Sequence, residues 1–389
     1  GRKRDRISSS SGRRICSAFW ARTEPQRRKD AILSRHTIVD RTYRFITVFD
    51  DETGAYLRTG ILENGRDTGV DPFMASFPHL IDVGVMGHCA HGQSGLCAKA
   101  GIGCYQSGRD ISAPNMTLAD FDWIVRQCRG RVNQFALGGR GDPDMHEHFG
   151  DLLRLCREND IVPNFTTSGF GLTAENAALC ARYCGAVAVS WYRSDYTLKA
   201  IQMLLDAGVK TNIHYVLGNN SIDEAIRRLR EQDFPQGVNA LIFLLHKPAG
   251  QGTRENVLSV TDPRTEAFFR EIDRPHPFKV GLDACNVPGA LRFCKKILPE
   301  SLDTCEGGRF SCYIGPDLKM VPCSFDQERR YEVQLDAETS IEEAWNSPAF
   351  QRFRDRLRSS CPDCPQKELC LGGCPLMPEI VFCDSPHRT

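Results

Sequence analysis

The chain has 389 residues, of which 41% are hydrophobic and 25% charged, as is usual for a soluble globular protein. Lysine plus arginine and aspartate plus glutamate both total 49, so the net charge is zero and a large nucleic-acid-binding surface is not expected. No apolar run reaches the roughly 18 residues of a membrane-spanning helix. The length fits two or three domains, or one large barrel with additions.

Cysteine is unusually frequent and unevenly distributed. The chain contains 18 cysteines, and eight of them lie between Cys305 and Cys383. The first residues are basic and polar and lack the apolar segment of a signal peptide, so we expect a cytoplasmic protein with reduced thiols. Clustered cysteines in such a chain indicate metal binding rather than disulfide bonds.

The first 79 residues divide into a tail and a hairpin region. Residues 1–35 carry eleven Lys or Arg against three acids and a run of serines, which predicts a disordered, dispensable tail or an arm for an acidic partner. In the region 36–79, two apolar segments at 45–49 and 56–61 flank a turn-rich segment at 50–54. This pattern predicts a β-hairpin.

Strands and helices alternate from residue 80 onward. Strands are expected at 80–86, 133–137, 161–167, 186–190, 209–216 and 238–245, and helices at 117–128, 144–159, 173–184, 196–207, 221–232 and 263–272. Capping boxes are expected at Thr117 with Asp120 and at Ser221 with Glu224. Six such units predict an α/β fold, a partial (β/α)6 TIM-like barrel over residues 80–290, with its chemistry at the C-terminal ends of the strands.

The regular alternation stops after a last strand at 278–282. A cysteine-rich domain is expected over residues 300–389, with one amphipathic helix at 340–356 between its two cysteine groups. Seven further cysteines, among them Cys285, fit buried and inert positions in helices or the core. Cys285 stands out among these because it closely follows the end of the last strand, at Asp283.

The first cysteine group follows the first barrel strand. Cys89, Cys97 and Cys104 are separated by seven and then six residues. Three thiolates in one loop can hold three irons of a [4Fe–4S] cluster and leave the fourth iron open to a small ligand. Together with His88 and His91 they could instead bind zinc. The spacing alone leaves both interpretations open.

Polar and glycine-rich segments follow the next three strands, at 138–143, 166–169 and 190–193. Because the C-terminal ends of parallel strands meet at one end of a barrel, these segments could surround a bound nucleoside.

With this combination of motifs the chain resembles the radical S-adenosylmethionine (radical SAM) enzymes, which hold a cluster in a three-cysteine loop after the first strand. The resemblance implies that Gly138, Gly139, Gly141 and Asp142 form a variant of the motif that binds the methionine amino group. It also implies cofactor contacts from Ser168, Ser190 and Arg193, and from Asn212 or His214. The chain departs from the family in its cysteine spacing, which is usually three and then two residues, and in Gly103, where the family has an aromatic residue; here Tyr105 follows the third cysteine.

The second cysteine group resembles, almost spacing for spacing, the SPASM extension of peptide- and protein-modifying radical SAM enzymes such as the sulfatase-maturating enzymes. The resemblance assigns Cys305, Cys312, Cys323 and Cys374 to one auxiliary [4Fe–4S] cluster. It assigns Cys361, Cys364, Cys370 and Cys383 to another. Some relatives leave an open site at the position of Cys312, and two zinc sites of a ribbon type are the alternative.

The resemblance implies reductive cleavage of S-adenosylmethionine to a 5′-deoxyadenosyl radical, which abstracts hydrogen from a peptide or protein substrate. Crosslinking, thioether formation, epimerisation or oxidation would follow, with electrons from a flavodoxin- or ferredoxin-type reductant. Asp326, Asp283 and Tyr313 are candidates for the residue that completes the reaction. The alternatives are a radical SAM enzyme acting on a small molecule or RNA, and a zinc-dependent structural or nucleic-acid-binding protein.

Overall fold

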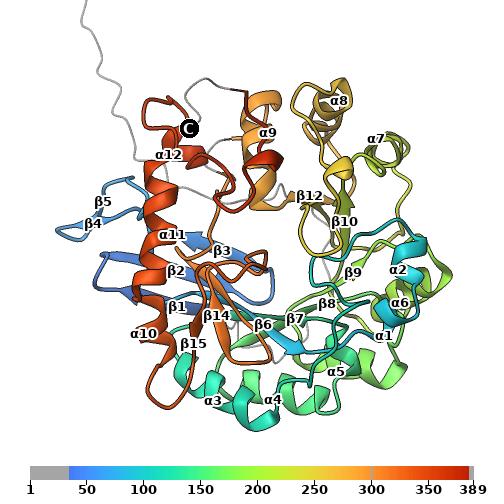
Figure 1. Ribbon diagram of the computed structural model, residues 1–389, viewed down its shortest axis with the longest axis horizontal. Helices are drawn as coiled ribbons and strands as arrows, with labels where there is room; N and C mark the ends of the chain where they lie inside the picture. The colour runs from blue at the N-terminus through green and yellow to red at the C-terminus, as the bar shows by residue number, and fades with distance from the viewer. Residues whose placement is uncertain (1–34, 299–300, 385–389) are drawn as a thin grey trace, which may run out of the picture.

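A ten-stranded, mostly parallel sheet forms the centre of the computed structural model, which describes residues 35–298 and 301–384 (Figure 1). The strand order is β12-β11-β10-β9-β8-β7-β6-β13-β14-β15. The predicted tail at 1–35 lies outside the described residues except for Arg35, which opens a strand.

Seven parallel strands build the partial barrel that the sequence predicts. They are β6 (Leu80–Met86), β7 (Gln134–Gly139), β8 (Val162–Thr167), β9 (Val187–Ser190), β10 (Thr211–Leu217), β11 (Ala240–Leu245) and β12 (Lys279–Leu282). The connecting helices are α3 (Leu118–Cys128), α4 (Phe149–Glu158), α5 (Ala174–Tyr183), α6 (Asp195–Asp206), α7 (Ile222–Glu231) and α8 (Pro263–Ile272). The α/β partial-barrel prediction is confirmed.

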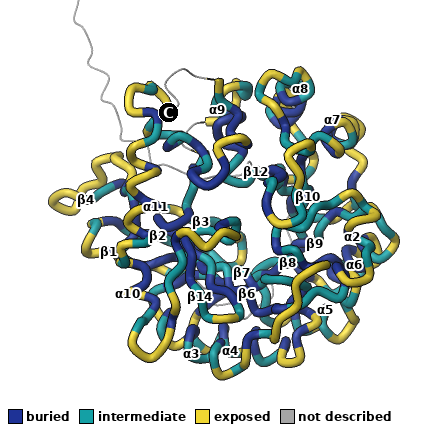
Figure 2. The backbone as a smooth tube through the Cα atoms, in the orientation of Figure 1, coloured by how far each residue is buried: buried dark blue, intermediate teal, exposed yellow. Residues whose placement is uncertain are grey.

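Residue alternation along the strands separates the helix-covered side from the interior of the barrel. In β10, Ile213, Tyr215 and Leu217 are buried in the main hydrophobic core, whereas Asn212 and His214 between them are only partly buried (Figure 2). Successive side chains of a strand point to opposite faces. The barrel interior is therefore lined in part by polar groups.

The helix caps predicted at Thr117 and Ser221 have different outcomes in the structure. Thr117 caps α3 by accepting a hydrogen bond from the backbone N–H of Asp120, as predicted. Ser221 does not cap α7, because its hydroxyl accepts from Gly218 N and donates to Val216 O instead.

The predicted helix 340–356 is two helices, α10 (Ile341–Trp345) and α11 (Pro348–Ser359). A new cap at Ser347 followed by proline at the first helical position starts the second helix, since proline there lacks the N–H that would continue the first.

The N-terminal region is an antiparallel sheet of β1 (Arg35–Asp40), β2 (Phe45–Asp50) and β3 (Ala55–Arg58). The predicted hairpin is β2–β3, and β1 was not predicted. A short hairpin of β4 (Leu62–Glu63) and β5 (Arg66–Asp67) follows. Arg58 ties the sheet to the C-terminal region through a 2.8 Å contact of its Nη2 with Asp303.

The cysteine-rich region extends the main sheet. β13 (Ser311–Ile314) pairs in parallel with β6, and β14 (Lys319–Val321) and β15 (Val333–Gln334) continue the sheet in antiparallel fashion. Between β12 and these strands lie a short 3-10 helix, η3 (Ala284–Asn286), and α9 (Val287–Phe293); α12 (Lys367–Cys370) and η5 (Pro378–Ile380) follow α11. No helix in the described part of the chain is long and apolar enough to cross a membrane.

Candidate functional site

The three-cysteine loop lies at the C-terminal end of β6 and contains two short helices, α1 (Ala90–Gln93) and α2 (Leu96–Lys99). Cys89 is the N-cap of α1, and its sulfur accepts a 3.0 Å hydrogen bond from Gly92 N. Cys97 lies inside α2, and Cys104 follows in the extended part of the loop.

The three thiols lie close enough to interact. Burial raises the pKa of Cys89 to about 11, and the charges of Asp142, Cys104 and Cys97 contribute to this rise. Tyr192, which follows β9, interacts with all three thiols; burial, then Asp142 and the thiols, raise its pKa well above the usual range. The expanded loop thus brings its three cysteines together beside one aromatic side chain.

The ends of four other strands anchor this loop across the mouth of the barrel. Arg140 after β7 donates to Gln106 O at 2.8 Å and to Gly87 O at 3.3 Å. Further bonds to loop carbonyls come from residues after β9, β10 and β11: Arg193 to Ala100, Asn220 to Gly101 and Gln251 to Cys104. The long loop is therefore held in place by hydrogen bonds from residues around the mouth of the barrel.

The glycines after β7 differ in the space beside them. A Cβ placed on Gly138 would meet no heavy atom within 4 Å, so this backbone borders open space. Gly139 has a φ of +104°, and a Cβ there would lie 2.6 Å from Met86 O. A Cβ on Gly141 would lie 2.2 Å from His88 O. Gly139 and Gly141 are therefore required for close packing against the cysteine loop, and Gly138 for access.

Two buried carboxylates lie beside this open backbone. Asp142 accepts hydrogen bonds from the backbone N–H and the hydroxyl of Ser168, at 2.8 and 2.5 Å. Asp144 is also buried, and its carboxylate lies beside Thr167 but forms no hydrogen bond of good geometry among the described residues. Burial, and then the charge of Asp142, raise the pKa of Asp144 to about 7. Such a group is suited to receive a cationic or hydrogen-bond-donating ligand.

The other predicted cofactor contacts lie at different positions along the barrel strands. Ser190 ends β9, and Arg193 lies three residues on, where it forms a 2.6 Å ion pair with Glu224. Asn212 is the second residue of β10, at the opposite end of the barrel, and accepts a hydrogen bond from Asn239. The structure therefore does not bring Asn212 to the mouth, and His214 only reaches the middle of the strand, 3.2 Å from Thr166 Oγ1.

A second group of thiols lies behind the mouth and contains Cys285, Cys305, Cys323 and Cys374. The thiols of Cys285 and Cys374 lie within hydrogen-bonding reach of each other. Cys323 interacts electrostatically with Cys305 and Cys285. Lys247, buried and 2.5 Å from Asp283, lies beside Cys285 and Cys374 with its ammonium 4.7 Å from the ring centre of Phe325.

The structure places Cys312 elsewhere. It lies in β13, paired with Ile81 of β6, and is 2% exposed. Its electrostatic neighbours are Cys128, Asp82 and Arg354. The predicted group of Cys305, Cys312, Cys323 and Cys374 is thus not assembled, because Cys312 is part of the sheet and Cys285 lies with the other three.

The last cysteine group gathers at the C-terminal end of the described chain. Burial raises the pKa of Cys370 to about 11, and the charges of Cys383 and Cys361 add to this effect. Cys364 follows in the turn that begins at Cys361, with a 3.1 Å backbone bond between the two. These are the four cysteines that the resemblance assigns to one cluster.

The three predicted catalytic candidates have different surroundings. The carboxylate of Asp326 accepts backbone N–H groups of Arg330 and Tyr331 and so holds its own loop. Asp283 accepts from Lys247 and from Leu245 N. Tyr313 on β13 lies across Gly84 of β6, where a Cβ would come within 2.3 Å of the tyrosine hydroxyl.

Sequence analysis overlooked several groups near these sites, among them Asp82, Asp144, Tyr192 and Lys247. Asp82 lies opposite Tyr313 in the register of β6 and β13, and burial raises its pKa to about 7. A lone carboxylate within the otherwise apolar strand β6 was the available signal. For Lys247, only its place just after β11 pointed to the site.

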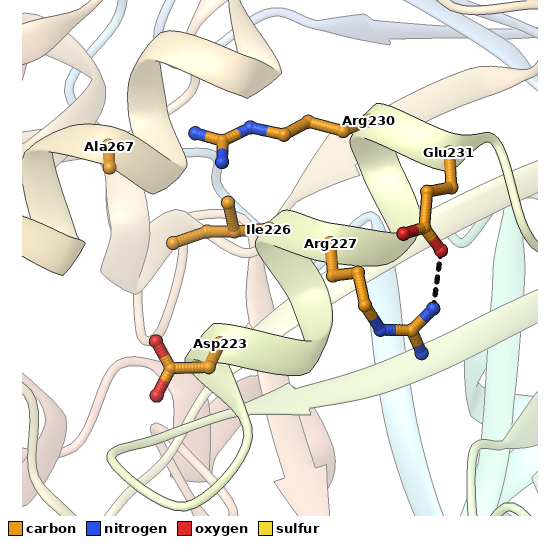
Figure 3. Close-up of a pocket in the computed structure, with 6 residues that line it drawn as sticks. All are labelled: Asp223, Ile226, Arg227, Arg230, Glu231 and Ala267. Carbon is orange, nitrogen blue, oxygen red and sulfur yellow. Dashed lines mark hydrogen bonds and ion pairs between the residues drawn. The ribbon is translucent and has the colours of Figure 1, made fainter.

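A separate cavity on the outside of the barrel does not belong to this site. It has a volume of about 350 Å³ and lies between α7 and α8, lined by Asp223, Ile226, Arg227, Arg230, Glu231 and Ala267. Figure 3 shows Arg227 bonded to Glu231 on the surface of α7. None of the predicted site residues lines it.

Comparison with known proteins supports the fold. Residues 305–365 match the SPASM iron-sulfur cluster-binding domain. The structure of Streptococcus suis SuiB bound to the precursor peptide SuiA matches with a TM-score of 0.61 and 17% identity, over 80% of this chain and 76% of that one. The protein has the radical SAM/SPASM fold.

A second solved structure is also similar in fold. The structure of anSMEcpe with bound AdoMet matches with a TM-score of 0.56 and 16% identity, covering 79% of this chain and 88% of that chain. The same enzyme with AdoMet and the peptide Cp18Cys matches with a TM-score of 0.57 over 79% and 91% of the two chains. At these identities the likeness concerns the radical SAM/SPASM fold and not the reaction.

Proposed function

We propose that this protein is an enzyme that uses S-adenosylmethionine and three [4Fe–4S] clusters to abstract hydrogen from a peptide or protein substrate. The observation that carries the proposal is the gathering of Cys89, Cys97 and Cys104 at the mouth of a radical SAM/SPASM barrel, beside the open backbone of Gly138. When bound there, the cofactor pair would supply a 5′-deoxyadenosyl radical through reductive cleavage of S-adenosylmethionine.

The donor sets fit clusters better than zinc. Zinc holds all of its ligands at about 2.0–2.3 Å from one centre. In the described part of the chain, no three His, Cys, Asp or Glu side chains are placed to hold a metal ion in this way. A four-iron cluster binds each thiolate to a different iron and therefore accepts more widely separated thiols. Three thiols of one loop that interact with one another support this second arrangement.

The residues around Gly138 fit the methionine part of S-adenosylmethionine. Asp144 is a buried carboxylate that lies beside Thr167 without a hydrogen bond of good geometry among the described residues, and an α-ammonium group would stabilise its charge. Asp142 and Ser168 hold the neighbouring backbone in place through two hydrogen bonds. We assign Asp144 to the ammonium group, Gly138 to backbone contact with it, and Ser190 and Arg193 to the remaining polar groups of the cofactor.

The substrate side of the site is the barrel interior near β6 and β13. Tyr313 and Asp82 are partners in the register of β13 and β6 there, whereas Asp326 accepts two backbone hydrogen bonds within its own loop. We therefore assign Tyr313, assisted by Asp82, to substrate contact and proton movement, ahead of Asp326 and Asp283. The peptide class is supported by SuiB and anSMEcpe, which are similar in fold and have been crystallised with peptides.

The test is the triple variant Cys89→Ala, Cys97→Ala and Cys104→Ala, purified and reconstituted without oxygen. We expect 5′-deoxyadenosine formation with dithionite, or with a flavodoxin- or ferredoxin-type reductant, to fall to background. Iron should drop from about twelve to about eight atoms per chain. Undiminished 5′-deoxyadenosine would refute the assignment of the site, and zinc without iron in the wild-type protein would refute the proposed function.

A further inference from the structure

Cys285 lies outside the part of the chain that matches the SPASM domain, yet it belongs to the thiol group behind the mouth. It is the middle residue of η3, directly after β12. Asn286 fixes this turn by donating to Phe243 O at 3.1 Å and to Asp283 Oδ1 at 2.7 Å. The backbone of Cys285 is therefore held at the C-terminal edge of the barrel.

Three separate segments bring their thiols to Cys285. Cys374 lies within hydrogen-bonding reach of it, and both Cys305 and Cys323 interact with it electrostatically. Gly307 lies against both Cys305 and Cys323, since a Cβ there would lie 3.6 Å from the sulfur of Cys305 and 3.5 Å from the Cβ of Cys323. The group therefore contains four thiols without Cys312.

Cys312 cannot join this group without breaking the sheet. Its neighbours in β13 pair with β6, from Ser311 with Leu80 to Ile314 with Val83. Its side chain is buried on the face that carries Cys128 rather than beside the four thiols. Rotating it into the group would require β13 to turn over, because successive residues of a strand face opposite sides.

A buried cation accompanies the four thiols. The ammonium of Lys247 is 2.5 Å from Asp283 and lies near both Cys285 and Cys374. A set of four thiolates carries concentrated negative charge, and a fixed cation next to it stabilises the ionised form. The same ammonium pairs with Asp283, and its place beside Cys285 and Cys374 would also stabilise thiolates that bind a cluster there.

We propose that Cys285, and not Cys312, is the fourth thiolate ligand of the first auxiliary [4Fe–4S] cluster, together with Cys305, Cys323 and Cys374. This inference rests on the proposed function, because it presumes that the thiols hold a cluster. Four protein thiolates leave no iron of this cluster open. The substrate would then be bound by the barrel and not by the auxiliary cluster.

The test compares Cys285→Ser with Cys312→Ser in the full chain, after anaerobic reconstitution. Iron analysis and Mössbauer spectroscopy should show that Cys285→Ser loses up to one third of its iron or converts one cluster to a three-iron form. Cys312→Ser should keep the wild-type iron content. Cys294→Ser is the matched control, since this partly buried thiol follows α9 and contacts Phe269 O outside the group.

A measurement on the wild-type protein covers the case in which Cys285→Ser does not fold. The loaded protein and the protein stripped of iron are alkylated under native conditions, and each cysteine is quantified by mass spectrometry. We expect stripping to raise the reactivity of Cys285 together with that of Cys305, Cys323 and Cys374, and to leave Cys312 unchanged. Iron-dependent protection of Cys312 but not of Cys285 would overturn the inference. Wild-type protein without iron would instead contradict the proposed function.

Discussion

The two thiol groups near the barrel are assembled in different ways. The group at the mouth comes from one loop of 16 residues between Cys89 and Cys104. The group behind it comes from separate segments at Cys285, at Cys305 and Cys323, and at Cys374. Spacing along the chain is informative for the first kind of site, because its ligands are neighbours in sequence. In the second kind, the fold decides which thiols meet.

Their supports differ as well. Hydrogen bonds from side chains and backbone at several strand ends position the mouth loop, whereas the rear group is held by the sheet, by η3 and by a buried ion pair. Damage to the loop should therefore affect one cluster and its chemistry. Damage to the rear group should affect the stability of the whole chain.

The largest effect is expected for Arg140→Met. This change removes both side-chain bonds that hold Gln106 and Gly87, so the loop should lose its fixed position. We expect 5′-deoxyadenosine formation to fall by at least about 100-fold, as displacement of reacting groups by about 1 Å can cost this much. About four irons should be lost while the auxiliary clusters remain.

Arg109→Met is the matched control for Arg140, because Arg109 lies in the same loop and pairs with exposed Asp110 rather than with loop carbonyls, although its charge also acts on Cys97. Its activity should stay near wild type. Equal losses in both variants would mean that the loop is sensitive to any change, and that Arg140 has no special anchoring role.

Features that depend on neighbouring residues could be predicted from the sequence, whereas features that depend on the fold could not. The strand β6 was predicted with its observed bounds, because a long apolar run followed by a cysteine loop is a strong local signal. The resemblance offered Asn212 as a cofactor contact, but this residue lies near the start of β10, and the predicted strand 209–216 already placed it in the first half of the strand. Cys312 matched a spacing, but spacing does not report that the residue belongs to a strand paired with β6.

At the rear group, Lys247→Met should lower the stability strongly. It leaves the partly buried carboxylate of Asp283 without its buried cation, and breaking a buried pair costs about 3–5 kcal/mol. Thermal unfolding of the iron-free protein measures the effect. The double variant Lys247→Met with Asp283→Asn should recover part of it.

Lys319→Met provides the comparison for Lys247. Its pair with Glu332 has a similar distance of 2.8 Å but is partly exposed, so its loss should cost less than about 1 kcal/mol. Equal effects of the two lysine variants would contradict the special role of the buried pair.

Substitutions of Gly138 and Gly139, the last two residues of β7, should affect cofactor binding and protein stability separately. Gly139→Ala should destabilise the protein by about 1–3 kcal/mol, since its φ of +104° and the 2.6 Å approach to Met86 O leave no place for a Cβ. Gly138→Ala meets no such clash and should keep its melting temperature. It should raise the Kd for S-adenosylmethionine about tenfold, or ~1.4 kcal/mol. Unchanged cofactor binding by Gly138→Ala would show that the open space serves another purpose.

The smallest effect is a pH dependence from Asp82 in the barrel interior. Burial raises the pKa of this carboxyl to about 7, so the folded state favours the neutral form. Below the usual range of an aspartate both states are protonated and no cost arises. As the pH rises towards 7, the unfolded chain ionises first and the folded state loses stability, by up to about 1.4 kcal/mol per unit of pKa difference.

Asp82→Asn removes this cost, so its advantage in melting temperature over the wild type should grow from pH 5 to pH 7 and level off above. Asp110→Asn is the control of opposite sign. Asp110 is exposed, and hydrogen bonds from Gln251 and Arg109 lower its pKa, so the contribution of the carboxylate is lost as the pH falls. A difference between Asp82→Asn and the wild type that does not change with pH would mean that Asp82 already ionises in its usual range, where an ion or a water inside the barrel compensates its charge.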